Sequence, residues 1–230
     1  MQQSSARVPI SETIVPDEIR DILLAHARPV RARKGHILIA AGLDAKDVFL
    51  VLEGRVQVTL LSPQGRETII REIGPGQIFG ELAAIDGEVR SANVTAVEPS
   101  HIAMLAGPTF LELIGSNDAL ARWIALHLTT QIRFLTARIY ELSTMSVGSR
   151  LQCELMRLCI EHGIENDQAI IENAPTHADL AARIGTNRES VTRELGLLAE
   201  EAIVYQSGRR LHILSVGKLG TLVRRLAAHG

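Results

Sequence analysis

The spacing of hydrophobic and polar residues changes along the chain. Between residues 35 and 105, short apolar or alternating runs are separated by glycines, whereas helical spacings prevail after residue 117. The short runs predict β-strands over residues 36–39, 48–52, 56–60, 67–73, 93–97 and 101–105. Glu53 and Gly54, which lie between two of these runs, predict a two-residue hairpin turn, because glycine tolerates a positive φ. Many short strands without intervening helices are typical of a sandwich or barrel, and we expect a jelly roll.

A long helix is predicted from about Asn117 to Met145. Apolar residues repeat along it in alternating steps of four and three, at Leu128, Ile132, Leu135, Ile139 and Leu142. This is the a/d stripe of a coiled coil, and we interpret it as the seam of a homodimer. The alternative is that the stripe packs on the chain's own barrel. Residues 146–149 break the helical pattern and predict a hinge.

The remainder of the chain predicts helices followed by a β-hairpin, so the fold class is α+β. The expected elements are a helix over 151–162, a helix pair over 176–184 and 187–201 around Gly185, and strands over 202–205 and 211–214 that flank the turn 206–210. The helical spacing of apolar residues and the glycine between the paired helices support this assignment.

Composition narrows the class of protein. Of the 230 residues, 46% are hydrophobic and 22% are charged, which is the balance of a soluble globular chain. The longest stretch without Asp, Glu, Lys or Arg has 13 residues, from Pro99 to Leu111, and a membrane-spanning helix needs about 20. The first residues, Met1–Ser5, lack the pattern of a secretory signal, so we expect a cytoplasmic protein. A net charge of −2 excludes a histone-like polycation, so any DNA binding must come from local arginines.

Metal, disulfide and catalytic chemistry are not expected. The two cysteines, Cys153 and Cys159, are too few for a disulfide framework and wrongly spaced for a zinc knuckle. The histidines never fall at the close helical spacing of paired metal ligands. We therefore predict no metal site and no catalytic residue, and a protein that is not an enzyme.

A first cluster of chemistry-bearing residues lies between residues 76 and 92. Gly80 allows a sharp turn into a short helix that starts near Leu82, and the free N–H groups at a helix start attract anions. Arg90 offers a guanidinium fork that matches phosphate oxygens, and the Glu81 carboxylate can accept hydrogen bonds from a sugar hydroxyl. Together these groups fit a ribose phosphate held inside a barrel. The alternative is that Glu81 is an ordinary first-turn charge and Arg90 a solvated loop residue.

This segment, from Gly80-Glu81-Leu82 to Arg90-Ser91-Ala92, resembles the phosphate-binding cassette of cyclic-nucleotide-binding domains, which have a jelly-roll barrel. The resemblance implies that Glu81 binds the ribose 2′-hydroxyl. It also implies that Arg90, Ser91 and the backbone amides of Gly80 to Leu82 bind the cyclic phosphate.

A second cluster lies between residues 176 and 195. Thr176 can cap a helix together with Asp179, and Gly185 permits a tight turn. The buried faces of the two helices are expected at Leu180, Ile184, Val191 and Leu195. This is the pattern of a helix-turn-helix.

The second helix of this pair has an outward face that suits DNA. This face carries Arg188, Glu189, Thr192 and Arg193. Arginine binds guanine bidentately and glutamate accepts from cytosine N4, so the face can recognise G·C pairs in the major groove. Arg209 and Arg210, in the predicted hairpin, would form a wing near the DNA backbone. The alternative is a solvated surface on which Glu189 and Arg193 simply pair.

Both clusters in this order, joined by a dimer helix, resemble the catabolite-activator (CRP/FNR) family of bacterial transcription regulators. The resemblance covers nearly the whole chain beyond the first fifteen or so residues. It implies a homodimer that binds a palindromic operator in double-stranded DNA, with RNA polymerase as a further partner. The implied parts are an effector-binding β-roll domain (1–116), a dimerisation helix (117–146) and a winged helix-turn-helix domain (147–230).

The family also implies roles for individual residues of the DNA-binding domain. The pattern Arg188, Glu189, Val191, Arg193 is like that of members that recognise TGTGA half-sites. By family position, His177 and Asn187 contact the phosphate backbone, and Ser190 faces the bases.

The identity of the effector depends on the long helix. Members that respond to cyclic AMP carry adjacent Thr-Ser there, which touch the adenine across the dimer. Here the matching pair is Leu135-Thr136, and only Thr136 offers a hydroxyl. Cyclic AMP is the expected effector and cyclic GMP the alternative. Neither cysteine lies near the N-terminus, which disfavours an iron–sulfur sensor.

The sequence is also compatible with three other functions. A member of the same family could sense haem-bound gas or no ligand at all. An enzyme that acts on cyclic nucleotides would need a metal or nucleophile near the phosphate, and none is apparent. A signalling adaptor would bind protein instead of DNA through its C-terminal domain.

Overall fold

The computed structural model describes residues 13–63, 65 and 67–227, and the chain folds as two compact units. The first unit ends at Ile132 and the second begins at Arg133, so the division falls within the long helix. The first residues of the chain, for which no secretory signal is predicted, lie outside the described residues.

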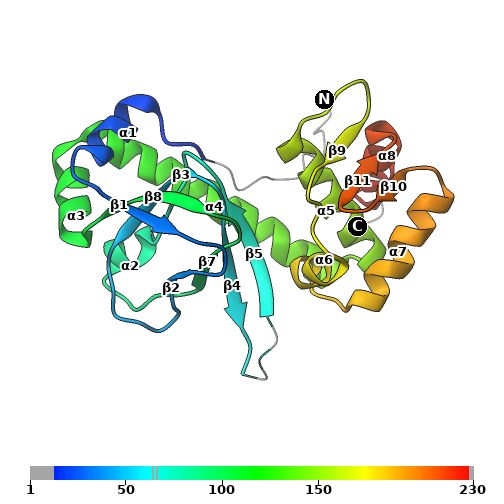
Figure 1. Ribbon diagram of the computed structural model, residues 1–230, viewed down its shortest axis with the longest axis horizontal. Helices are drawn as coiled ribbons and strands as arrows, with labels where there is room; N and C mark the ends of the chain where they lie inside the picture. Colours follow the sequence, from blue (N-terminus) through cyan, green and yellow to red (C-terminus); the bar gives the residue numbers. More distant parts are fainter. Residues whose placement is uncertain (1–12, 64, 66, 228–230) are drawn as a thin grey trace. The chain divides into compact units, whose positions relative to one another are not determined.

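The N-terminal unit is a β-roll. Within the described residues its strands are β1 (Arg28–Ala32), β2 (Ile37–Ile39), β3 (Val48–Glu53), β4 (Val56–Leu61), β5 (Glu67–Ile73), β6 (Ile78–Phe79), β7 (Asn93–Ala96) and β8 (Ser100–Leu105). They form two antiparallel sheets, ordered β1-β8-β3-β6 and β2-β7-β4-β5 (Figure 1). The expected jelly roll and the predicted strands are confirmed. β1 and β6 were not predicted. The sequence of β1 mixes arginines with apolar residues and a proline, and β6 has only two residues.

The core of the β-roll lies between its sheets and under three helices. Phe49 and Phe79 stack inside it, with ring centroids 4.9 Å apart. Helices α1 (Asp17–Leu24) and α3 (Gly107–Ser116) and the start of α4 (Asp118–Thr144) pack on the sheet that contains β3 and β8 (Figure 1). The fully buried Phe110 and Leu120 anchor α3 and α4 there. The sheet that contains β3 and β8 is thus packed against the helices on one face and against the second sheet on the other.

The predicted hairpin at Glu53 and Gly54 is wrong. β3 pairs with β6 and β8, whereas β4 pairs with β5 and β7, so the chain crosses from one sheet to the other here. Gly54 has a φ of +81°, and a Cβ added to it would lie 2.5 Å from the Pro99 carbonyl oxygen. The glycine is required by a tightly packed crossover, which strand spacing alone cannot distinguish from a hairpin.

The long helix α4 carries the apolar stripe predicted for a dimer seam. Leu128 is half-buried and packs on the core of its own β-roll, as the alternative interpretation required. In contrast, Ile132, Leu135, Ile139 and Leu142 are 64%, 44%, 65% and 46% exposed. The stripe therefore divides: its first residue belongs to the chain's own core, and the other four form an apolar surface on the helix.

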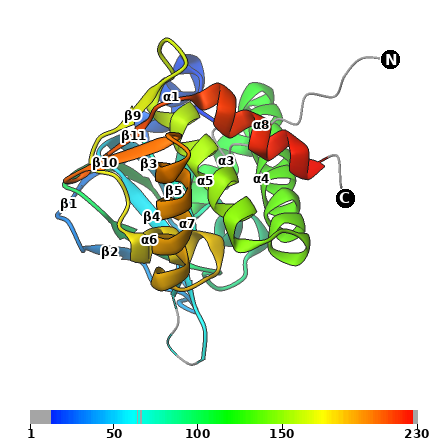
Figure 2. The same cartoon turned by 90° about the vertical axis from the view of Figure 1, so that its right-hand side faces the viewer.

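The C-terminal unit contains the predicted helix pair and hairpin (Figure 2). Within the described residues its further elements are α5 (Val147–His162), β9 (Ala169–Ile171), α6 (His177–Ile184), α7 (Arg188–Glu200), β10 (Val204–Ser207), β11 (Arg210–Ile213) and α8 (Val216–Ala227). The strand order is β10-β11-β9. β9 and α8 were not predicted.

Several predicted boundaries in this unit differ from the structure, among them the start of α5 and the ends of both hairpin strands, β10 and β11. α5 begins one turn earlier than expected because Ser146 caps it, and its side chain accepts a hydrogen bond from the Ser149 N–H. Only Met145 and Ser146 therefore separate α4 from α5. The hairpin turn is also tighter, because residues 206, 207 and 210 belong to the strands and Gly208 and Arg209 alone connect them.

A buried charge cluster joins three helices of the C-terminal unit. It consists of Arg138 and Glu141 from α4, Glu154 and Arg157 from α5, and Arg183 from α6, each at most 9% exposed. The Glu154 carboxylate lies 3.0 Å from Arg157 Nη1, 3.2 Å from Arg183 Nη1 and 3.5 Å from Arg138 Nη1. Glu141 pairs with Arg138 and Arg157. Each carboxylate thus has more than one guanidinium partner.

The charges of this cluster set the protonation of Glu154. Burial on its own raises the pKa of Glu154, but the charges of Arg183, Arg157 and Arg138 outweigh burial and lower the pKa below its ordinary value. Glu154 is therefore ionised at neutral pH and is the electrostatic centre of the cluster.

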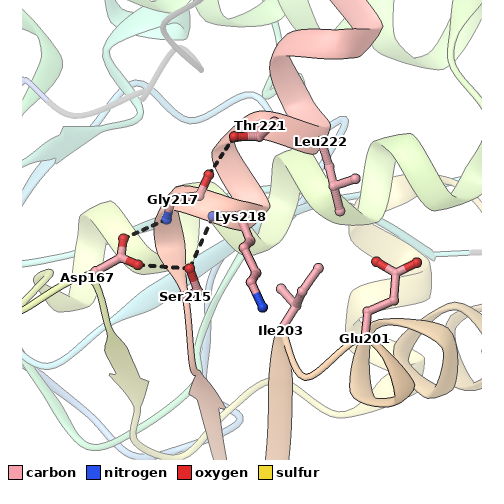
Figure 3. Close-up of a pocket in the computed structure, with 8 residues that line it drawn as sticks. All are labelled: Asp167, Glu201, Ile203, Ser215, Gly217, Lys218, Thr221 and Leu222. Atoms are coloured by element: carbon pink, nitrogen blue, oxygen red, sulfur yellow. Dashed lines mark hydrogen bonds between the residues drawn. The ribbon is translucent and has the colours of Figure 1, made fainter.

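α8 is attached through Asp167, at the edge of an open depression in the surface (Figure 3). The Asp167 carboxylate accepts hydrogen bonds from the Gly217 N–H at 2.7 Å and from the Ser215 hydroxyl at 2.8 Å. Lys218 and Glu201 line the same depression. The Asp167 carboxylate is thus hydrogen-bonded to residues at and just before the start of α8, so its role here is to attach the helix.

Candidate functional site

The first candidate site is the segment between β6 and β7. After Phe79, Gly80 turns the chain with a φ of +86° into the short helix α2 (Glu81–Asp86). A Cβ on Gly80 would lie 2.8 Å from the Asp47 carbonyl oxygen and 2.9 Å from Arg90 Nη1. Only glycine fits here, because a side chain would collide with Arg90 and the Asp47 carbonyl. Arg90 therefore lies against the start of α2, where backbone N–H groups have no partner within the helix.

Arg90 is the buried cation of this site. It is 5% exposed; its Nη1 donates to the Gly80 carbonyl at 2.8 Å and its Nη2 to the Asp47 carbonyl at 2.6 Å. Its Nε is buried, and no described residue accepts a hydrogen bond from it. Burial lowers the pKa of Arg90, and the charges of Asp47 and Glu81 oppose that shift. A fixed, buried guanidinium with an unused donor is suited to receive an anion.

Glu81 is the acidic group of the site, and it is 4% exposed. His127 of α4 approaches it, with His127 Nε2 3.4 Å from Glu81 Oε1. Arg71 of β5 is opposite Val58 in the sheet register, and the charge of Glu81 partly offsets the lowering of the Arg71 pKa by burial. Neither His127 nor Arg71 was predicted, because both are far from the cassette in sequence and carry no motif.

The other cassette residues surround this buried centre. Leu82 is 47% exposed on α2, and Ser91 is exposed directly after Arg90. The loop after α2 is closed by Lys46, another residue that sequence analysis missed, whose Nζ donates to the Gly87 carbonyl at 2.7 Å and to the Glu88 carbonyl. The five predicted cassette residues therefore lie in one continuous segment, fastened from outside by Lys46 and Asp47.

Leu135 and Thr136 belong to the other unit of the chain from the cassette. Both are exposed on α4, in the part of the helix that belongs to the C-terminal unit. Their predicted contact with a base across a dimer stays a prediction.

The second candidate site is the pair α6 and α7, whose arrangement matches the predicted helix-turn-helix. Thr176 and Asp179 form a capping box, in which each side chain accepts a hydrogen bond from the other residue's backbone N–H. The Asn187 side chain caps α7 by accepting from the Ser190 N–H at 2.9 Å. The predicted buried residues, at most 7% exposed, share one core: Leu180, Ile184, Val191 and Leu195.

α7 presents the expected polar face to solvent. Its exposed residues are Arg188, Glu189, Thr192 and Arg193, with Ser190 half-buried beside them. The alternative pairing of Glu189 with Arg193 does not form, because Arg193 Nη2 lies 3.1 Å from Glu194 Oε1 instead. Within the described residues Arg188 and Glu189 make no ion pair. Their charged groups are therefore exposed to solvent.

His177 and the hairpin adjoin α7. His177 Nδ1 lies 2.8 Å from Thr192 Oγ1, and His177 Nε2 lies 3.3 Å from Gln206 Oε1, so the ring links α6 to α7 and β10. Arg209 is exposed in the hairpin turn, whereas Arg210 pairs with Glu172 at 2.8 Å. Of the two predicted wing arginines, Arg209 is the one without an ion pair in the described part of the chain.

Metal ligands do not gather in either site. In the described ranges, no group of three or more potential ligands (His, Cys, Asp or Glu) could hold a metal ion, and none of the helices is apolar over a length that could cross a bilayer. Cys153 and Cys159 are buried in α5, where burial raises the pKa of Cys153 to about 11 and that of Cys159 to about 12. Both thiols are therefore protonated and unreactive at neutral pH.

Comparison with known proteins covers both sites. Residues 29–117 match the family model of the cyclic nucleotide-binding domain, and residues 149–222 match that of the Crp-like helix-turn-helix domain. A curated relative, the Cyclic AMP receptor protein of Thermus thermophilus, is 29% identical over 196 residues, which are 85% of this chain and 88% of the relative.

Solved structures share the fold of most of this chain. A mutant of CooA from Carboxydothermus hydrogenoformans has a TM-score of 0.78 at 21% identity and covers 94% of this chain and 98% of its own. The c-di-GMP-responsive global regulator CLP of Xanthomonas campestris has a TM-score of 0.74 at 20% identity and covers 85% of this chain and 97% of its own. The two solved structures therefore share with this chain the fold of a β-roll, a long helix and a helix-turn-helix.

Proposed function

The chain is a DNA-binding member of the CRP/FNR family of transcription regulators, and we propose that a cyclic nucleotide bound in its β-roll controls its binding to DNA. Cyclic AMP is the proposed effector, with cyclic GMP as the alternative. The effector would shift an equilibrium between two states of the dimer, by no more than its difference in affinity for the two states.

The observation that carries this proposal is the state of Arg90. Its two Nη atoms are fixed by the Gly80 and Asp47 carbonyls, while its buried Nε has no acceptor within the described residues. A buried donor without a partner costs about 1–3 kcal/mol, and more when it is charged. We infer that the cyclic phosphate supplies the missing acceptor, with the amides of Gly80 to Leu82 and the Ser91 hydroxyl around it. Glu81 would accept the ribose 2′-hydroxyl.

Calorimetric titration of the purified protein with cyclic AMP and with cyclic GMP tests the effector assignment. We expect saturable binding of at least one of them, with one site per chain. Absence of heat with both nucleotides would contradict nucleotide control. The absorbance spectrum would then distinguish a haem-dependent sensor, and titration with cyclic di-GMP would test the effector named for the Xanthomonas relative.

The DNA-binding proposal leads to a prediction for α7. Arg188, Glu189 and Arg193 would contact bases of a TGTGA-like palindrome, and Ser190 and Thr192 would lie against them. Arg188→Ala is expected to cost about 1–3 kcal/mol per half-site on the palindrome and little on a scrambled duplex. Fluorescence anisotropy with both duplexes measures this difference.

Arg209→Ala is the matched control, because Arg209 is proposed to contact phosphate, as are His177 and Asn187. This variant should weaken binding to both duplexes equally and reduce the salt dependence. Equal affinity of the unaltered protein for the palindrome and the scrambled duplex would refute the operator assignment.

Dimerisation through α4 leads to another prediction. Ile132, Leu135, Ile139 and Leu142 are exposed apolar residues in one stripe, and such a stripe is stable when a second copy covers it. We expect Ile139→Glu to convert a dimer to a monomer in sedimentation, because the charge would be buried in the seam.

Leu126→Glu is the control for this experiment, because Leu126 is 56% exposed on the same helix but lies off the stripe. It should leave the dimer intact. A monomeric unaltered protein, or an Ile139→Glu variant that sediments as a dimer, would show that the seam lies elsewhere.

The remaining parts of the proposal follow from this dimer. Leu135 and Thr136 would touch the base of the nucleotide bound by the partner subunit, and Thr136 alone would offer a hydrogen bond. The protein would act in the cytoplasm, contact RNA polymerase and have no enzymatic activity, as fits its transcription-regulator relatives.

A further inference from the structure

His127 is a buried polar residue whose role the cassette resemblance does not explain. It lies on α4, is 1% exposed and stacks on Trp123, with ring centroids 5.3 Å apart and planes inclined by 21°. Its Nδ1 is 2.5 Å from the Thr13 hydroxyl oxygen. The ring is therefore held by a stacking partner and by a hydrogen bond at one nitrogen.

The other ring nitrogen faces the acidic group of the cassette. His127 Nε2 is buried without a hydrogen-bond partner in the described residues, and it lies 3.4 Å from Glu81 Oε1. If the Thr13 hydroxyl donates to Nδ1, the ring hydrogen is on Nε2 and is directed at Glu81. A buried N–H just beyond hydrogen-bond distance from a carboxylate needs only a small movement of Glu81 to be satisfied.

We propose that His127 is a positioning residue for Glu81: its Nε2–H holds one carboxylate oxygen, so that the other accepts the 2′-hydroxyl of the bound nucleotide. This inference rests on the proposed function of the cassette. Binding of the hydroxyl draws Glu81 toward His127 and closes the 3.4 Å gap. Because His127 lies on α4, Glu81 is then hydrogen-bonded to the helix that carries the apolar stripe.

The charges around Glu81 are consistent with this role. Arg90 and Arg71 both interact electrostatically with Glu81, so the carboxylate lies among cationic groups. Arg90 is fixed by backbone carbonyls. His127 approaches Glu81 from α4.

A purely structural histidine would behave differently, and the 2′-hydroxyl distinguishes the two roles. We suggest calorimetry with cyclic AMP and 2′-deoxy-cyclic AMP, and with the corresponding guanine pair, on the unaltered protein, His127→Phe and His127→Gln. Phe keeps the stack on Trp123 but has no N–H, whereas Gln restores a donor. Ile124→Val is the matched control, since Ile124 lies on the same helix as His127 and is buried in the core of the β-roll.

The unaltered protein should prefer the ribonucleotide by about tenfold or more. In His127→Phe that preference should largely disappear, because ribonucleotide binding weakens while deoxynucleotide binding changes little. His127→Gln should recover part of the preference, and Ile124→Val should retain all of it. Thr13→Val, which removes the partner of Nδ1, should act in the same direction as His127→Phe.

The possible failures are separable. If the unaltered protein prefers the ribonucleotide and both His127→Gln and His127→Phe keep the full preference, His127 does not act through Glu81, although the function of the cassette stands. Should His127→Phe not fold, the same comparison with Thr13→Val and His127→Gln decides. If the unaltered protein binds none of these nucleotides, both the proposed function and this inference are overturned.

Discussion

Replacing Glu154 with glutamine is expected to lower the free energy of unfolding by about 3–5 kcal/mol, the cost of breaking a buried ion pair by removing one charge. Glu154 faces Arg138, Arg157 and Arg183 within 3.5 Å, and all of these side chains are buried. The substitution preserves shape but leaves three guanidinium groups with Glu141 as the remaining carboxylate of the cluster. Urea unfolding followed by circular dichroism measures the effect.

The control for this prediction is Glu200→Gln, because Glu200 is an exposed carboxylate on α7. Its effect should stay within about 0.5 kcal/mol. A change of less than 1 kcal/mol in Glu154→Gln would show that the buried charge cluster does not stabilise the junction of α4, α5 and α6.

The pH dependence of stability tests the same cluster. Because the pKa of Glu154 is lower in the folded chain than in the unfolded chain, its contribution is fully present above the unfolded value of about 4.3. The contribution is lost as the pH falls through the lower, folded pKa. We expect Glu154→Gln to flatten the acid limb of the stability curve relative to the unaltered protein. An identical acid limb would contradict the lowered pKa.

Arg90→Ala is expected to weaken cyclic-nucleotide binding by about 100-fold or more. The variant removes the buried Nε donor and the positive charge that would bind the phosphate. Charge-assisted hydrogen bonds are worth about 1.5–3 kcal/mol each. The affinity of Arg90→Lys should lie between those of the unaltered protein and Arg90→Ala, because lysine keeps the charge but loses the planar fork. Calorimetry with the effector measures both affinities.

Two checks separate loss of binding from loss of fold. Arg90 also fastens the Gly80 and Asp47 carbonyls, so the thermal unfolding of Arg90→Ala must show that the β-roll persists. Arg31→Ala removes one exposed positive charge from the same unit and should leave affinity nearly unchanged. Nucleotide affinity in Arg90→Ala equal to that of the unaltered protein would place the ligand elsewhere.

Sequence periodicity was sufficient for much of the fold, because each confirmed strand and helix has a strong local pattern. The spacing of Leu180, Ile184, Val191 and Leu195, for example, predicted the buried faces of the helix pair. β1 has no such pattern, since Arg28 and Arg31 are exposed while Ala32 is buried. Its pairing with β8 is set by distant residues.

The local sequence pattern gave wrong predictions where the structure depends on contacts between residues distant in sequence. Gly54 has the chemistry of a hairpin glycine, but its close approach to Pro99 and Ser100 makes it a crossover between sheets. Leu128 fits the heptad as well as Ile132 does, yet it is packed on the β-roll. Only the tertiary structure determines which residues of a periodic stripe remain exposed.

The candidate sites show the same division. The cassette and α7 were predicted because their residues are close in sequence and form recognisable motifs. His127, Arg71 and Lys46 reach the cassette from α4, β5 and the loop before β3. Single residues of these types carry no signal in sequence, and only the folded chain brings them together.

Control of DNA binding by a cyclic nucleotide in the β-roll can be measured in a single assay. The most direct measurement is the affinity of the purified protein for a labelled TGTGA palindrome, by fluorescence anisotropy, with and without saturating cyclic AMP or cyclic GMP. We predict that one nucleotide changes the affinity by at least about fivefold, the lower end of typical allosteric coupling, and that Arg90→Ala abolishes the response. An operator affinity that neither nucleotide changes would show that the β-roll does not regulate DNA binding through a cyclic nucleotide.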